Sequence, residues 1–153
     1  MLELPHVVVG AAIATKIGNP ALALPLALSS HFVLDVLPHW NPHLNRELKE
    51  KGRIGLKTTM FIVVDVIASL AAGFFIASQV LPDVTHFWVV IAASFLAVAP
   101  DVVEGPHFFL RWRYPFVEKL IKFQKSIQND APPLLGLLTQ VLIMGAAFWW
   151  IFS

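Results

Sequence analysis

The amino-acid sequence predicts an all-α integral membrane protein, and three observations lead to this fold class. Of the 153 residues, 57% are hydrophobic and only 14% are charged, whereas a soluble domain carries about 25% charged residues. The mean hydropathy is +0.70. Three apolar runs approach or reach the roughly 20 residues that a simple transmembrane helix needs. The chain is therefore expected to form a single membrane domain.

About five helical segments are expected, as two helical hairpins and a C-terminal transmembrane helix. The first hairpin covers 5–38, the second covers 58–105, and the last span lies within 132–153. The helical segments themselves are expected at 6–17, 20–37, 58–80, 84–103 and 133–152. Because 6–17 is too short to cross a membrane alone, the first pair is either a tight hairpin or a re-entrant element. The second hairpin is expected to end at Gly105-Pro106, which are helix-breaking residues.

Basic residues are concentrated in two segments outside the apolar runs. Five lie in the loop 39–57 and five lie in 106–131, whereas the turn 81–86 has none. The positive-inside rule places both basic segments in the cytoplasm, with the N-terminus inside and the C-terminus outside. Within the second segment, apolar residues at helical spacing over 116–127 are interleaved with lysines, which is typical of an interfacial amphipathic helix. An ordinary positive-inside loop would explain these charges equally well.

Several kinds of site are excluded or not indicated. The chain has no cysteine, so disulfides and thiolate metal sites are excluded. A metal would have to be held by His, Asp and Glu, which suits zinc, manganese or iron. The sequence has no P-loop, no dinucleotide-binding glycine pattern, no nucleophile elbow and no HExxH motif. The basic segments carry no nucleic-acid motif, so no nucleic-acid partner is expected.

The most informative residues lie where apolar sequence meets polar sequence. His31 and Asp35 are four residues apart and share one face of a helix, and His39 follows one turn later. Burying such groups is costly unless they are paired or bind a metal. The ionisable residues near the expected cytoplasmic ends are His6, His31, Asp35, His39, Asp101, Glu104 and His107. Their common level indicates one site, built either for metal ligation or as a His–Asp network that fixes helix packing.

Two carboxylates are candidates for proton transfer. Asp65 is the only charged residue of its span and lies roughly 12 Å deep, at 1.5 Å per residue. Such a residue faces the bundle interior or a wet cavity, as a ligand, a base or a protonated structural group. Asp101 and Glu104 share one helix face, and close carboxylates repel unless a cation or proton lies between them. Glu104 is expected to be the general base, with Asp65 as the second candidate.

A short internal repeat relates the two hairpins. Asp35-Val-Leu-Pro-His39 is similar to Asp101-Val-Val-Glu-Gly-Pro-His107. Each follows a helix that is expected to run toward the cytoplasm. Repeats around a shared central site are common in membrane proteins. The repeat therefore predicts that both hairpins contribute to one site.

Three motifs resemble those of a known family. They are His6-Val-Val-Val-Gly10, Ser30-His31-x-x-Leu34-Asp35-x-x-Pro38-His39 and Pro100-Asp101-x-x-Glu104. The segment 5–107 thereby resembles the YdjM-type membrane-bound metal-dependent hydrolases of bacterial inner membranes, and more distantly the His/Asp-rich helices of zinc-dependent phospholipases C. The resemblance implies a bacterial or archaeal cytoplasmic membrane and the metal-site residues His6, His31, Asp35, His39 and Asp101. The family's Pro-Asp-x-Asp-His pattern is replaced here by Pro100-Asp101-Val-Val-Glu104.

These observations predict a membrane-embedded metal-dependent hydrolase at the cytoplasmic leaflet. One or two divalent ions, most simply zinc, would lower the pKa of a bound water and polarise a phosphoryl oxygen. The depth of the site indicates a lipid headgroup or lipid-linked phosphoester, with Arg111 and Arg113 as candidates to hold the phosphate. Two alternatives stay open: a metal-ion or proton transporter, and a non-catalytic structural or partner-binding protein. Monomer and homo-oligomer are both compatible with the sequence.

Overall fold

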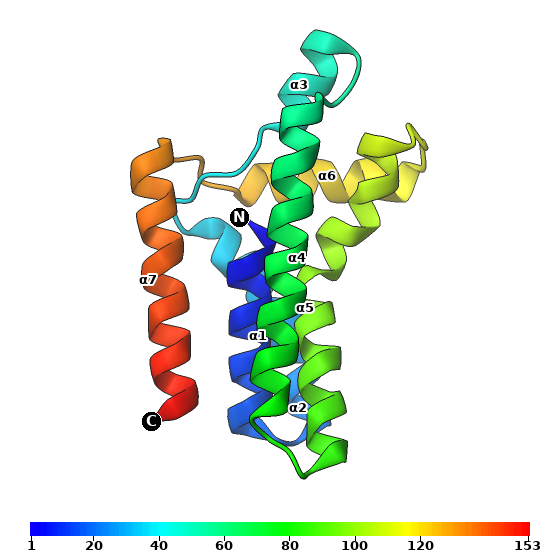
Figure 1. Ribbon diagram of the computed structural model, residues 1–153. Helices are drawn as coiled ribbons and strands as arrows, with labels where there is room; N and C mark the ends of the chain where they lie inside the picture. Colours follow the sequence, from blue (N-terminus) through cyan, green and yellow to red (C-terminus); the bar gives the residue numbers. More distant parts are fainter.

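The computed structural model describes all residues from 1 to 153 and consists of seven helices (Figure 1). The helices are α1 (Glu3–Ile17), α2 (Pro20–Val36), α3 (Leu44–Lys51), α4 (Leu56–Ser78), α5 (Val84–Phe109), α6 (Pro115–Ile127) and α7 (Pro133–Phe152). Three of them, α4, α5 and α7, are long and apolar enough to cross a membrane. The chain is therefore a multi-pass membrane protein, and the all-α prediction is confirmed.

The number of helices is larger than the sequence analysis predicted. α6 occupies the segment expected to be an amphipathic helix, whereas α3 lies in a segment that was expected to be a loop. α3 has little apolar periodicity to reveal it, only Leu44 and Leu48, which pack against the cluster of Phe108, Val117 and Ile121. It is supported instead by ion pairs at i, i+4 spacing, Arg46 with Glu50 at 2.8 Å and Lys51 with Glu47 at 2.9 Å, and such pairs stabilise short exposed helices.

The prediction that α5 ends at Gly105-Pro106 is wrong, because the helix continues to Phe109. The last turn is closed by the backbone N–H groups of Leu110 and Trp112, which both donate to the Pro106 carbonyl. Phe108 in this turn is buried against Val117 and Ile121 of α6. Packing between α5 and α6 therefore outweighs the local preference of glycine and proline to end a helix.

α1 is the central helix of the bundle and packs against α2, α4, α5 and α7 (Figure 1). Eight of its fifteen residues are buried, and most of these are small or β-branched. A Cβ atom at Gly10 would lie 2.6 Å from the Ala97 Cβ and 2.9 Å from the Ala93 carbonyl oxygen of α5. Small residues of this kind allow membrane helices to approach closely. The contact fixes α5 against the start of the chain.

α1 and α2 form a tight hairpin, as one of the two sequence interpretations predicted. Gly18 adopts a positive φ of 62° at the turn, the Asn19 side chain accepts a hydrogen bond from the Ala21 N–H at 3.0 Å, and Pro20 opens α2. These are typical helix stop and start signals. The seventeen residues of α2 extend about 25 Å, less than the roughly 30 Å of a bilayer core.

The two ends of the bundle differ in charge. α3, α6 and the chain segments beside them lie at one end, and the turns after α1 and α4 lie at the other (Figure 1). Ten of the eleven Lys and Arg residues belong to 46–57 and 111–125, and so gather at the α3 and α6 end. This end is called the basic end below.

Gly136 provides a test of how α7 packs. A Cβ at Gly136 would overlap the backbone of His39 and Trp40, whereas one at Gly145 on the same helix would meet open space. We expect Gly136→Ala to lower the free energy of unfolding by about 1–3 kcal/mol through overpacking. Gly145→Ala should be neutral or slightly stabilising, since Ala is the better helix former. Thermal unfolding in one detergent checks this, and equal Tm values would contradict the packing.

Candidate metal centre

Five of the expected site residues converge at the basic end of the α1–α2 hairpin. They form the His/Asp cluster, defined as His6, His31, Asp35, His39 and Asp101. The first four are fully buried, and the Asp101 side chain is 21% exposed. They come from α1, α2, the segment after α2, and α5. These five residues therefore come together from elements far apart in the sequence.

Asp35 lies at the centre of the cluster. Its Oδ1 atom is 3.4 Å from His6 Nε2 and 3.8 Å from His39 Nε2, and its Oδ2 atom is 3.7 Å from His31 Nε2. His31 Nε2 is in turn 3.6 Å from Asp101 Oδ1. These separations exceed ordinary hydrogen bonds. They are close to the roughly 3.3 Å between two ligand atoms of tetrahedral zinc with bonds of about 2.0–2.1 Å.

Several ring nitrogens in the cluster have no hydrogen-bond partner. Both nitrogens of His6 and Nε2 of His39 are buried and unpaired. His39 Nδ1 donates to the Leu37 carbonyl at 2.8 Å, so Nε2 of the neutral ring carries a lone pair. Burial lowers the pKa of His39 and so favours that neutral ring. The lone pair of His39 Nε2 faces Asp35 Oδ1, which also accepts a hydrogen bond from the Met1 amino group at 2.6 Å.

The orientation of His31 is fixed by α5. Its Nδ1 atom donates to the Ala97 carbonyl at 2.8 Å, in the turn before Pro100, whose ring and missing N–H disturb the helix there. This bond leaves Nε2 directed at Asp35 and Asp101. A metal-binding histidine commonly donates its other ring N–H to a carbonyl in this way. The His6 and His31 rings are also stacked, with centroids 4.2 Å apart.

Two glutamines of the α6 region contact the cluster, and the sequence analysis missed both. Gln124 is buried, its Oε1 lies 2.7 Å from His31 Nε2, and its Nε2 donates to Glu104. Gln128 Nε2 donates to Asp35 Oδ2 at 3.3 Å. The sequence did contain one indication of Gln124, because this residue lies at helical spacing from Val117 and Ile121, which are both buried. Phe116 and Phe123, which belong to the apolar side of the amphipathic pattern over 116–127, are exposed.

Asp65 caps α1 in this structure. Its Oδ2 accepts the Glu3 N–H at 2.8 Å and its Oδ1 accepts the Leu4 N–H at 3.3 Å. The first amides of a helix have no partner within the helix, and Leu2 at the N-cap position supplies no side-chain acceptor. Asp65 makes no ion pair with the cluster. Its role as a ligand or base stays a prediction, beside the capping role that the structure gives it.

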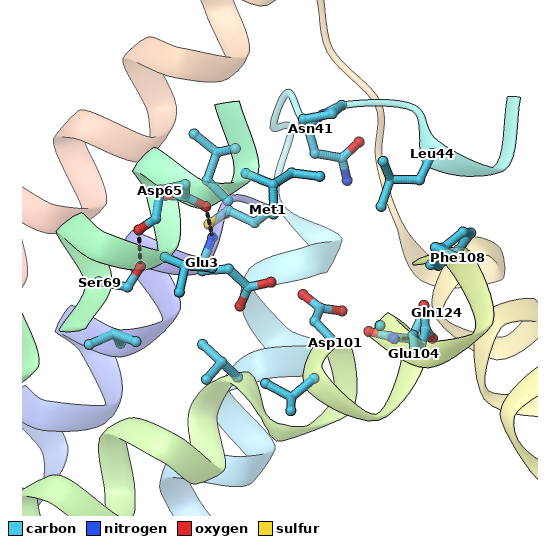
Figure 2. Close-up of a pocket in the computed structure, with 18 of the residues that line it drawn as sticks. Met1, Glu3, Asn41, Leu44, Asp65, Ser69, Asp101, Glu104, Phe108 and Gln124 are labelled. Carbon is cyan, nitrogen blue, oxygen red and sulfur yellow. Dashed lines mark hydrogen bonds between the residues drawn. The ribbon is translucent and has the colours of Figure 1, made fainter. Parts of the chain in front are cut away.

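A cavity of about 780 Å³ adjoins the cluster at Asp101. The side chains of Glu3, Asp101 and Glu104 point into it from two helices, and Asp65 lies at its wall (Figure 2). Glu104 is held by Gln124 through Oε1. The sequence analysis did not select Glu3, whose Oε2 is buried without a partner.

The remaining candidates lie outside the cluster. His107 is buried but makes no hydrogen bond or ion pair with it, and its Nδ1 has no partner. Arg111 donates to the Gly52 carbonyl, and Arg113 is 3.6 Å from Glu118 at the surface. None of the three lines the cavity. A phosphate-binding role for the two arginines therefore stays a prediction.

The Met1 amino group supplies a positive charge to the cluster. It is buried and lies 2.6 Å from Asp35 Oδ1. The neighbouring Leu2 N–H donates to Gln140 of α7 at 2.9 Å. These contacts hold the start of α1 between Asp35 and α7.

Comparisons with protein-family models, with curated proteins and with solved structures found no match for this chain. The proposed function therefore rests on the chemistry and geometry of the site.

The two roles of Asp65 can be separated by substitution. We expect Asp65→Ala to lower the free energy of unfolding by about 1–2 kcal/mol, the usual cost of a lost helix cap. Asp65→Asn keeps one acceptor oxygen and should lose less stability. Both variants should retain any metal bound by the His/Asp cluster, measured by elemental mass spectrometry beside thermal unfolding. Metal lost from Asp65→Asn at an unchanged Tm would instead make Asp65 a ligand.

Proposed function

We propose that this protein is a metal-dependent hydrolase that acts at the basic end of the bundle on a lipid headgroup or lipid-linked phosphoester. The observation that carries the proposal is the convergence of three buried histidines and two aspartates, with unpaired ring nitrogens on His6 and His39. The ligand-capable atoms of His6, His31 and Asp101 lie within 4.8 Å of one another. Histidine nitrogens and carboxylate oxygens suit zinc, with manganese or iron as further candidates.

The proposal includes one or two ions, which His6, His31, His39, Asp35 and Asp101 would hold. Asp35 Oδ1 faces His6 and His39, whereas Oδ2 faces His31. Asp35 would thus be available to ions held by the histidines on either side of it. When bound, such ions lower the pKa of water and polarise a phosphoryl oxygen.

Glu104 is the proposed general base. It lines the cavity beside Asp101, and Gln124 holds one of its oxygens. The other oxygen can accept a proton from a water that lies within about 3 Å. Arg46 and Lys125 also line the cavity and carry the charge that a phosphate group requires.

The proposed orientation follows from charge. The basic end carries ten of the eleven Lys and Arg residues, and the positive-inside rule places such an end in the cytoplasm. With α4, α5 and α7 as spans, the N-terminus lies inside and the C-terminus outside. The proposed location is a bacterial or archaeal cytoplasmic membrane, which is the setting implied by the resemblance of the motifs in 5–107.

A non-catalytic polar network is the second candidate. His31 is hydrogen-bonded at both nitrogens, and Asp35 has the Met1 amino group as a counter-charge. These contacts could stabilise helix packing without a metal. A transport path has less support, because the hydroxyls of Ser69 and Ser94 donate to their own helices and the cavity beyond them is lined by apolar residues.

Metal content tests the proposal directly. The full chain, with a C-terminal tag because Met1 is buried, is purified in detergent without chelator and measured by elemental mass spectrometry. We expect one or two zinc, manganese or iron ions per chain, lost in His31→Ala and in Asp35→Ala. His86→Ala should retain them, since His86 bonds to the Ala14 carbonyl at the far end. No metal after purification, and none taken up on reconstitution, would reject the hydrolase and leave the polar network.

Glu104→Gln separates an enzyme from a structural protein. We expect hydrolysis to fall by roughly 10²–10⁴-fold, the usual contribution of a general base, with the metal content unchanged. The assay follows release of phosphate or glycerol phosphate from vesicles that contain phosphatidic acid and phosphatidylglycerol. Glu118→Gln, at a half-exposed position of α6 away from the cavity lining, is the control and should retain full activity. Equal rates for the two variants would remove Glu104 from the mechanism.

A further inference from the structure

The cavity extends far beyond the polar groups at its end. From Glu3, Asp101 and Glu104 it follows the facing sides of α4 and α5 as far as Gly73 and Ile91. Along this path the lining is almost entirely apolar, apart from two serines. We call this apolar part, between α4 and α5, the lateral slot.

The lateral slot is closed at the back and open at the outer surface of the bundle. Its back wall contains the buried residues Val7, Ser69, Ser94 and Val98, contributed by α1, α4 and α5. Its edges contain exposed apolar residues: Leu70, Phe74 and Phe95. Because α4 and α5 are both long and apolar enough to span the membrane, this opening faces hydrocarbon and not water.

The length of the slot matches one leaflet of a bilayer. The rise from Asp65 to Gly73 on α4 is about 12 Å, and that from Asp101 to Ile91 on α5 is about 15 Å, at 1.5 Å per residue. Half of a hydrocarbon core of roughly 30 Å is about 15 Å. The apolar part of the cavity is therefore about as long as the acyl region of one leaflet.

The charges at the polar end fit the headgroup of the same molecule. Arg46 and Lys125 line the cavity at its polar end, where their charges can attract a phosphate group. A water-soluble phosphoester would contact only this end and leave the apolar walls without a ligand. The combination of an apolar slot open to lipid and a charged end fits an anionic membrane lipid.

We propose that the lateral slot takes one acyl chain of a membrane phospholipid, which moves sideways between α4 and α5 from the surrounding leaflet. Its phosphate would then lie beside Asp101 and Glu104. This inference rests on the proposed function for the identity of the site, and it adds the class of substrate and the route by which the substrate reaches the site.

Photo-crosslinking in proteoliposomes tests the slot. The probe is phosphatidic acid with a diazirine midway along one acyl chain; on photolysis the diazirine loses dinitrogen, and the carbene inserts into a nearby C–H or O–H bond. We expect adducts at Ser69, Ser94 or Val98, which are buried and beyond the reach of lipids that only surround the bundle. Unlabelled phosphatidic acid should suppress these adducts. Adducts confined to outward positions such as Val64 would overturn the proposal.

A matched pair of variants on α4 sharpens the test. Leu70 is 58% exposed and lies at the edge of the slot, whereas Ile67 is 60% exposed and lies outside it. Both positions face outward, so a tryptophan at either should leave the fold intact. Leu70→Trp is expected to lower the buried adducts severalfold, and Ile67→Trp to leave them unchanged. Equal adduct yields in the two variants would count against the slot.

The design separates this inference from the proposed function. Crosslinking is measured on the full chain as purified and after treatment with a chelator, beside metal content and hydrolysis. Buried adducts in a protein that neither binds metal nor hydrolyses phosphoesters would support the slot and reject the hydrolase. Metal binding and hydrolysis of a soluble aryl phosphate without buried adducts would support the hydrolase and reject the slot.

Discussion

The structure depends on compensation of one buried charge, the carboxylate of Asp35. An ionised carboxylate out of water is costly unless it is paired and hydrogen-bonded. The groups around it are His6 of α1, His31 of α2, His39, the Met1 amino group and Gln128. They come from the start of α1, from the end of α2 and the residues just after it, and from the segment after α6. Neutralising this charge therefore brings together parts of the chain that apolar packing alone would not place in register.

The fold supports the cluster from a distance. His39 lies in an extended segment that pairs with 129–131, through bonds from His39 N–H to Asn129 and from Ala131 N–H to His39. Gln140 of α7 donates to the Trp40 carbonyl at 2.9 Å, while its oxygen accepts the Leu2 N–H. α7 thus connects the segment that carries His39 to the start of α1. A helix with no residue in the site consequently contributes to its geometry.

The sequence predicted which helices form better than where they end. It also predicted the residues of the cluster better than the residues that hold them in place. Long apolar runs and i, i+4 spacing sufficed for α4, α7 and the His31–Asp35 pair. The internal repeat predicted equivalent positions for His39 and His107, but only His39 lies in the cluster. α2 ends before Pro38, so the chain leaves the helix and places His39 beside Asp35, whereas α5 continues as a helix through Pro106. Asp65 as a cap for α1 and Gln124 between His31 and Glu104 depend on which helices meet. The local sequence pattern carries no information about which helices meet.

The cavity beside the cluster holds an excess of negative charge that needs an occupant. Glu3, Asp65, Asp101 and Glu104 all line it. Asp65 is compensated by the amides of α1 and Glu104 by one amide of Gln124. Neither Glu3 nor Asp101 forms an ion pair with Lys or Arg, and close carboxylates repel unless a cation or protons lie between them. The unpaired nitrogens of His6 and His39 beside these carboxylates are the reason why a divalent cation, and not protons alone, is proposed for the site.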